Sequence, residues 1–121
     1  MSLLFDAEGY FCEGEVPKNW KFDMELGRII LTNKTLSLMK KTNINLTEID
    51  SNFKKLNELY KIPLLNINKA SVIKKGRIYV LEVETTDAYL FSITMADYKK
   101  SGKKESIELT KLINKNILRG F

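Results

Sequence analysis

The chain has 121 residues, a net charge of +5 and no histidine, with 44% hydrophobic and 29% charged residues. This size and composition fit one folded globular domain, which we expect to span residues 1–121. Without histidine, Ser-His and Cys-His nucleophiles and zinc sites built on histidine are excluded. The glycines do not cluster into a phosphate loop, and the acidic residues form no convincing catalytic pair. We therefore expect no catalytic residue, no metal and no cofactor.

The cysteine content and the N-terminus indicate a cytoplasmic setting. Cys12 is the single cysteine, so it forms no internal disulfide, which favours a reducing compartment. The segment Met1–Asp6 has no basic region and does not resemble a secretion signal. Uncharged apolar stretches such as Ile62–Ile67 are far too short to cross a bilayer.

Positive charge is unevenly distributed along the chain. Residues 1–27 carry six acidic and two basic side chains, whereas residues 28–121 carry nine acidic and eighteen basic ones. Such asymmetry can mark an anionic partner. However, seventeen of the twenty basic residues are lysine, and only Arg28, Arg77 and Arg119 offer a planar guanidinium that binds phosphate through two hydrogen bonds. A solvated lysine surface is the favoured interpretation.

The first predicted elements are a strand and a loop. Residues Leu3–Cys12 are rich in bulky side chains and predict a strand with an interruption near residues 7–9. Residues 13–22 contain Gly14 and Pro17, which predict a loop.

A hairpin is predicted around the turn at residues 33–34. The flanking segments Gly27–Thr32 and Thr35–Lys40 are both strand-like, and asparagine tolerates the left-handed backbone that tight hairpin turns require. In the second segment Leu36 and Leu38 occupy alternate positions, which indicates that mainly one face is buried.

The periodicity changes at residues 46–60, which predicts a helix near 47–60. Apolar residues recur there at three- and four-residue steps, as in an amphipathic helix: Leu46, Ile49, Phe53, Leu56 and Tyr60. Thr47 and Asp50 resemble a capping arrangement, and Pro63 follows the end of the segment. Such a helix either covers an open edge or end of the sheet, which we favour, or binds a partner.

Strands return after Pro63, separated by turn signals. One or two strands are predicted at Leu64–Ile73, another at Arg77–Glu84 and the last at Ala88–Thr94. The segment Arg77–Glu84 is apolar on both faces up to Val83, so we expect it to be central and largely buried. In the last, Tyr89, Phe91 and Ile93 should share one face. The regular spacing of short strands favours a sandwich or a small barrel.

A second amphipathic helix is predicted from about Ser106 to Arg119. Its apolar stripe consists of Leu109, Leu112, Ile113 and Ile117. Acidic residues near its start and basic residues near its end match the helix dipole. The elements together predict a mainly β fold with helices, in the α+β class.

The order of these motifs resembles that of pleckstrin-homology-like domains, in particular their GRAM-type members. The hairpin Gly27–Leu38 is similar to the GRAM signature, Ile62-Pro63-Leu64 followed by Ile67 is similar to a recurrent strand, and Arg77–Ile93 matches the paired strands before the last helix. The resemblance implies an antiparallel sandwich or partly open barrel of about seven strands, closed by a C-terminal helix. The predicted helix near 47–60 departs from this pattern.

A narrower resemblance is to the N-terminal domain of archaeal taxis adaptors of the CheF family. It is carried by the start at Phe5, Gly9 and Phe11, the hairpin, the Ile-Pro-Leu strand at Ile62 and a last helix that runs into Gly120. This resemblance implies an adaptor between the response regulator CheY and the archaellum motor, and a chain that represents only part of a longer protein.

The first functional hypothesis is a non-catalytic adaptor that binds a protein. Its surface would be the exposed sheet face or the helix near 47–60. Trp20, beside Pro17 and Lys21, is either a binding hot spot or a plug for an open end of the barrel. No small-molecule substrate is expected.

The second hypothesis is binding to an anionic phospholipid surface, as in some GRAM-like domains. Lipid-binding members have a dense basic motif in the first loop, but here Lys18 and Lys21 stand among Glu13, Glu15, Asp23 and Glu25. The turn of Lys74, Lys75 and Arg77 offers a second basic site. Candidate contacts for a protein or an anionic partner are thus Lys18, Trp20, Lys21, Lys74, Lys75 and Arg77.

The third hypothesis is a nucleic-acid-binding module, suggested by the pI of 9.3 and the aromatic residues. The predicted strands direct Tyr79, Tyr89 and Phe91 towards the core, which leaves no stacking platform. The sequence therefore disfavours a nucleic-acid partner.

Overall fold

A computed structural model describes residues 3–40, 58–96 and 100–118. The fold is mainly β, with a seven-stranded antiparallel sheet in the order β4-β3-β2-β1-β7-β6-β5 and a C-terminal helix, α3. The strands are β1 (Leu3–Glu13), β2 (Glu25–Thr32), β3 (Thr35–Lys40), β4 (Glu58–Pro63), β5 (Ile67–Lys75), β6 (Ile78–Thr85) and β7 (Leu90–Thr94). The helical elements are α1 (Trp20–Asp23), the 3-10 turn η2 (Leu64–Asn66) and α3 (Lys103–Leu118). The predicted fold class is confirmed.

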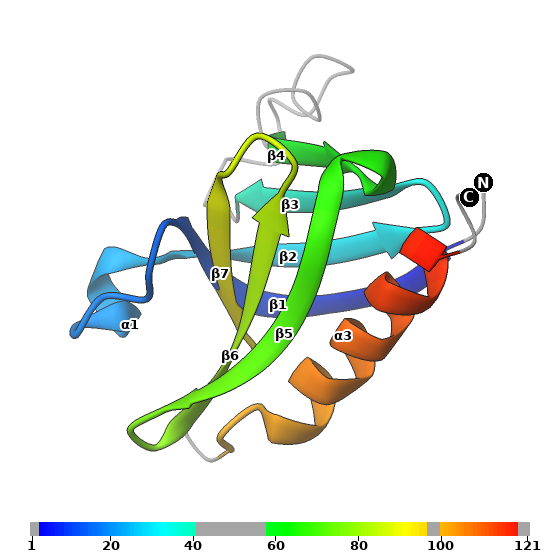
Figure 1. Ribbon diagram of the computed structural model, residues 1–121. Coiled ribbons are helices and arrows are strands. Elements are labelled where there is room, and N and C mark those ends of the chain that lie inside the picture. Colours follow the sequence, from blue (N-terminus) through cyan, green and yellow to red (C-terminus); the bar gives the residue numbers. More distant parts are fainter. Residues whose placement is uncertain (1–2, 41–57, 97–99, 119–121) are drawn as a thin grey trace, which may run out of the picture.

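The sheet bends where β1 passes from one half to the other. β1 pairs with β2 along most of its length but with β7 only at Tyr10–Glu13. In Figure 1 the strands β1 to β4 run across the steeper strands β5 to β7, and α3 lies diagonally beside β5. The two ends of the sheet order, β4 and β5, are joined by η2 but do not pair with each other, so the barrel stays partly open.

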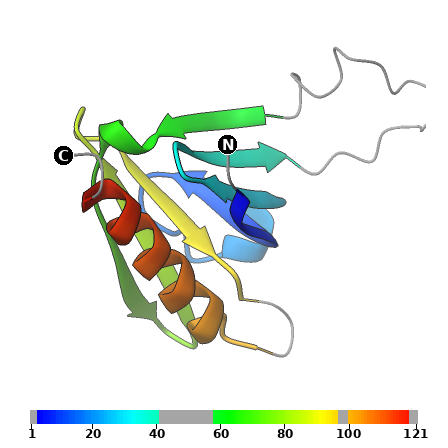
Figure 2. The same cartoon turned by 90° about the vertical axis from the view of Figure 1, so that its right-hand side faces the viewer.

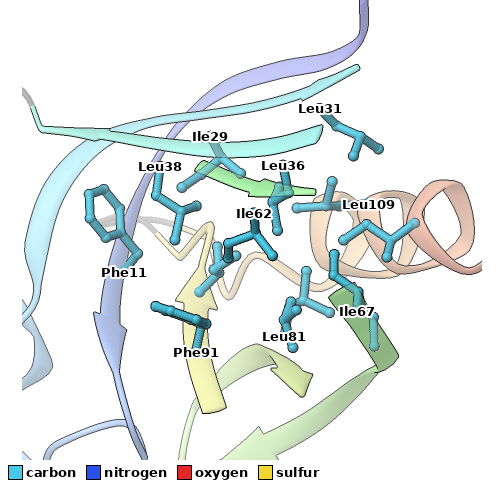
Figure 3. Close-up of a cluster of buried hydrophobic side chains, with 14 of the residues drawn as sticks. Phe11, Ile29, Leu31, Leu36, Leu38, Ile62, Ile67, Leu81, Phe91 and Leu109 are labelled. Carbon is cyan, nitrogen blue, oxygen red and sulfur yellow. The ribbon is translucent and has the colours of Figure 1, made fainter. Parts of the chain in front are cut away.

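The core lies between the two halves of the sheet and α3. Figure 3 shows side chains from both halves pointing towards one another, with Leu109 of α3 among them. Leu109 and Ile113 are fully buried, which is what the apolar stripe of the predicted helix requires. Figure 2 shows α3 lying along the half of the sheet that contains β5 to β7. The helix closes the core on one side, as predicted.

The β2–β3 hairpin is confirmed, but its turn is held differently from the prediction. Among the described residues, Ala88 is the only residue other than glycine with a positive φ, so Asn33 does not adopt the left-handed conformation. Instead, the Thr32 hydroxyl accepts hydrogen bonds from the backbone N–H groups of Lys34 (3.2 Å) and Thr35 (3.0 Å). A side-chain oxygen can organise a turn in this way without a left-handed residue.

Part of the helix predicted near 47–60 is wrong. Residues 58–60 belong to β4, where Tyr60 pairs with Leu38, and the rest of the segment lies outside the described residues. Tyr60 and Ile62 both turn towards the core at the two-residue spacing of a strand. Tyr60 fits both the three- and four-residue steps of the helix and the two-residue steps of a strand with Ile62. The sequence pattern therefore did not show where the strand β4 begins.

Two further details differ from the sequence prediction. β1 runs without a break through residues 7–9, and its irregular pairing lies between Leu3 and Phe5. Within residues 7–9, Gly9 pairs with Gly27, and a Cβ on either would crowd a neighbouring strand. Gly9 therefore marks a close approach of backbones and not an interruption of the strand.

The strands after Pro63 are also shifted. The segment predicted as Leu64–Ile73 begins with η2, and its strand starts at Ile67. The turn before β7 extends to Tyr89, whose side chain is 56% exposed, so its predicted core position is wrong. β6 is second from the edge of the sheet order, and Val80, Leu81 and Val83 are fully buried. Leu81 and Val83 belong to the core cluster that also contains Leu109 and Ile113 of α3.

Candidate binding cleft

The loop after β1 is anchored firmly where it begins. Gly14, at a φ of 90°, donates its N–H to the Leu90 carbonyl (2.6 Å), and its own carbonyl accepts a hydrogen bond from the Ser92 hydroxyl (2.6 Å). The loop ends in α1, where the Asn19 carbonyl accepts hydrogen bonds from the N–H groups of Phe22 and Asp23. The start of the loop is therefore fixed to β7, and its end is ordered by the turn of α1.

Trp20 is half-buried at the start of α1. Its ring meets that of Tyr10 edge to face, with centroids 5.1 Å apart, and the Lys21 ammonium lies 5.5 Å from the indole centroid. Edge-to-face and cation–π contacts both restrict the orientation of the indole. Trp20 also helps to line a cleft.

The second wall of the cleft is the tip of the β5–β6 hairpin. Lys75 pairs with Ile78, which leaves Gly76 and Arg77 as the turn. Gly76 has a φ of 61°, a left-handed conformation that glycine adopts without steric cost. The side chains of Lys75 and Arg77 are exposed on either side of it.

The loop and the hairpin tip enclose a cleft of about 460 Å³, which we call the basic cleft. Both elements lie on the same side of the molecule in Figure 1, away from the C-terminal end of α3. The lining residues are Val16, Pro17, Lys18, Trp20, Lys75, Gly76, Arg77 and Ile78. Two segments that the sequence offered as separate candidate sites are therefore parts of one site.

Positive charge in the basic cleft is uncompensated. No acidic residue lines it, and within the described part of the chain Lys18, Lys75 and Arg77 form no ion pair. Arg28, by contrast, binds Asp6 through two hydrogen bonds of 2.9 and 2.8 Å. A cation without an intramolecular partner is available to an anionic ligand.

The other two predicted contacts lie beside the cleft. Lys21 stacks on Trp20, and Lys74 lies 5.9 Å from the centroid of the Tyr79 ring. Lys103, at the first residue of α3, lies 5.6 Å from that same ring. Sequence reasoning did not identify Lys103, because it placed the start of the helix at Ser106.

Phe22 is the most exposed large apolar side chain in the described residues, at 89%. It lies on α1, and residues 18–22 also line a smaller hollow next to the basic cleft. Sequence reasoning had placed Phe22 in the loop without a role. The sequence feature that could have identified it is an aromatic residue in a polar segment without a strand-like pattern.

The groups that line this region are basic, aromatic and apolar. Within the described residues, no group of three or more His, Cys, Asp or Glu side chains is placed to hold a metal ion. Burial raises the pKa of the Cys12 thiol, which favours the protonated form over the nucleophilic thiolate. The basic cleft itself offers cations, the Trp20 side chain and apolar side chains.

A second hollow of about 480 Å³ lies between the β2–β3 turn, η2 and the end of α3. Its walls are largely apolar and include Pro63, Leu64 and Ile117, with Leu65 exposed beside them. It contains none of the predicted contact residues.

No protein family model matches the chain, and a search of curated proteins finds no significant relative. In the described parts of the chain, α3 and the shorter helical elements are all too short or too polar to span a bilayer.

Proposed function

We propose that the protein is a non-catalytic interaction module that binds an acidic segment of a partner protein in the basic cleft. The single observation that carries this function is the convergence of Lys18, Lys75 and Arg77 around the indole of Trp20, with no acidic residue in the lining. Complementary charge selects the partner and accelerates its approach. The aromatic wall supplies the apolar contact that makes such an encounter last.

The composition of the cleft is typical of a binding hot spot. Tryptophan and arginine are enriched among residues that contribute most to interfaces. Trp20 is already held by Tyr10 and Lys21, so little conformational entropy is lost when a ligand packs on it. Apolar residues of the partner next to its acidic groups would contact Val16, Pro17 and Ile78.

The taxis-adaptor role is a narrower form of the same function. It is supported by the sequence resemblance to the CheF family, under which the partner would be the response regulator CheY. Binding of purified phosphorylated CheY, compared with the unphosphorylated protein, tests this form separately.

The test for an acidic partner uses Trp20 itself, which is the only tryptophan in the chain. A peptide of alternating acidic and apolar residues should change the Trp20 emission, and the same peptide with glutamine for its acidic residues should not. Lys75→Gln/Arg77→Gln should weaken binding by about tenfold or more, equivalent to roughly 1.4 kcal/mol.

A matched control separates local from general charge. Lys111→Gln/Lys115→Gln makes the same change in net charge on exposed positions of α3 and should bind as the wild type does. Equal weakening by both double variants would show that only net charge matters and would contradict a site in the cleft. So would an absence of peptide binding at low salt.

A second candidate is an anionic membrane surface, favoured by the exposure of Phe22 next to Lys18 and Lys21. An exposed aromatic side chain beside lysines can enter the headgroup region while the charges bind anionic lipids. The acidic side chains of Asp23 and Glu25 oppose this mode, which is why it stands second.

Vesicle sedimentation distinguishes the two. Under the lipid mode, vesicles containing phosphatidylserine should retain the protein and neutral vesicles should not, and Phe22→Ser should reduce retention. Tyr89→Ser removes another exposed aromatic ring and serves as the control. Equal retention of the wild type and Phe22→Ser would exclude insertion of this side chain.

A further inference from the structure

Strand β5 ends the sheet order, and β6 is its only strand partner among the described residues. At Ala70 its free edge is occupied by a side chain of α3. The Asn114 amide oxygen accepts a hydrogen bond from the Ala70 N–H (3.3 Å), and the Asn114 amide nitrogen donates one to the Ala70 carbonyl (3.0 Å). One side-chain amide thus binds both backbone groups that a neighbouring strand would bind.

The direction of these bonds defines the free edge. In an antiparallel ladder, the N–H and C=O of one residue point to the same side, and the side alternates along the strand. The pairing of β5 with β6 is regular from Lys69 to Lys75. The backbone groups of Val72 therefore point away from β6 as those of Ala70 do, and they continue the edge beyond Asn114.

Charge protects only parts of this edge. Lys69 precedes Ala70, and Lys74 and Lys75 end the strand, whereas residues 70–73 carry no charge. Lysines on an edge strand discourage pairing with another chain, and uncharged edges invite it. Asn114 is bound at the start of the uncharged stretch.

We propose that Asn114 prevents the free edge of β5 from pairing with β5 of a second copy of this chain. An antiparallel pair centred on Val72 would join the two uncharged stretches and bring Lys69 of each copy opposite Lys75 of the other. The amide of Asn114 removes the hydrogen-bonding groups of Ala70 from this pairing. The lysines add a repulsion that salt screens.

Asn114→Leu tests this role of Asn114, because leucine has the same branched shape and a higher helix propensity but makes neither hydrogen bond. The wild type should remain monomeric by light scattering over a wide concentration range. The variant should dimerise, with an association constant raised by about tenfold or more, and more strongly at high salt. Asn114→Ala, which cannot clash, gives the same readout if the leucine variant does not fold.

Two controls tie the effect to the edge. The Asn116 amide bonds the Leu112 carbonyl within α3, so Asn116→Leu should stay monomeric. Adding Val72→Pro to Asn114→Leu removes an outward N–H without removing a bond to β6, and it should restore the monomer. Hydrogen exchange should show the Ala70 amide protected in the wild type and exposed in the dilute variant.

If the folded Asn114 variants stay monomeric at every protein and salt concentration, Asn114 does not prevent the pairing of β5. Equal association of the Asn116 variant, or association that persists with Val72→Pro in a folded protein, would also contradict the proposal.

Discussion

The two hairpins that β6 forms, with β5 and with β7, end in turns of opposite character. Each contains one residue in the left-handed region: Gly76 at a φ of 61° and Ala88 at 67°. The β6–β7 turn is fastened by Thr85, whose hydroxyl accepts from the Tyr89 N–H (3.1 Å), and by the Thr86 N–H, which bonds the Asn66 carbonyl (2.7 Å).

Within the described residues, no side chain or loop backbone forms a comparable hydrogen bond to the β5–β6 turn at Gly76 and Arg77. A Cβ on Gly76 would meet nothing within 4 Å, and the neighbouring Lys75 and Arg77 side chains are exposed. The fastened turn joins η2 to the sheet, whereas the open turn forms a wall of the basic cleft. The difference teaches that hydrogen bonds to the rest of the fold mark the turn that holds the sheet together, whereas exposed charge marks the turn that we propose as a wall of the binding site.

The largest expected effect is at the fastened turn. Thr85→Val should lower the free energy of unfolding by about 2 kcal/mol, because Thr85 is buried and its hydroxyl bonds are lost. Urea unfolding followed by Trp20 emission measures this. Ser101→Ala, on a half-buried hydroxyl whose side chain makes no bond to the described residues, is the control; equal losses would show that Thr85 does not hold the turn.

Gly76→Ala should lower the stability by about 1 kcal/mol. There is open space for the added methyl group, so the cost arises from the left-handed backbone alone. The binding of an acidic peptide should persist, since both cations remain. A loss of several kcal/mol would mean that this turn is packed more tightly than the open space implies.

Ala88→Gly is the reverse substitution and should raise the stability by roughly 0.5–1 kcal/mol. Glycine removes the steric cost at a φ of 67°, and the hydrogen bond from the residue 88 N–H to the Thr85 carbonyl is kept. The same unfolding measurement checks it. A destabilised variant would show that the Ala88 methyl group makes contacts worth more than the strain.

The smallest expected effect on stability is at the cleft. Lys75→Gln/Arg77→Gln should change the free energy of unfolding by less than about 0.5 kcal/mol, because neither side chain has an ion-pair partner within the described residues. Peptide binding measured on the same sample should nevertheless fall. A large loss of stability would assign these cations a structural role and remove the contrast between the turns.

Much of the fold was predictable because the signals are local. The hairpin at residues 27–40 was predicted from the alternation of apolar residues within a few strand positions. The closing helix was predicted from an apolar stripe that extends over a few helical turns. The mainly β class followed from the spacing of short strands. Tyr60 was assigned to a helix because its position fits both helical and strand periodicity. Only its pairing with Leu38 in the sheet distinguishes the two.

The candidate site was predictable only in pieces. Lys18 and Trp20 were selected for residue type, and Lys75 and Arg77 for turn position, as separate candidates. Their union in one cleft depends on how the bend of β1 brings β7 and β6 beside the first loop. Phe22 had no local pattern to distinguish an exposed ring from a buried one.

The sequence by itself therefore determined most of the strands, the last helix and the lack of histidine chemistry, because periodicity and composition are properties of neighbouring residues. Only the tertiary structure decided which cations converge and which backbone groups are left at an edge. Convergence and edges arise from contacts between distant segments, such as Asn114 with Ala70, and no local pattern encodes them.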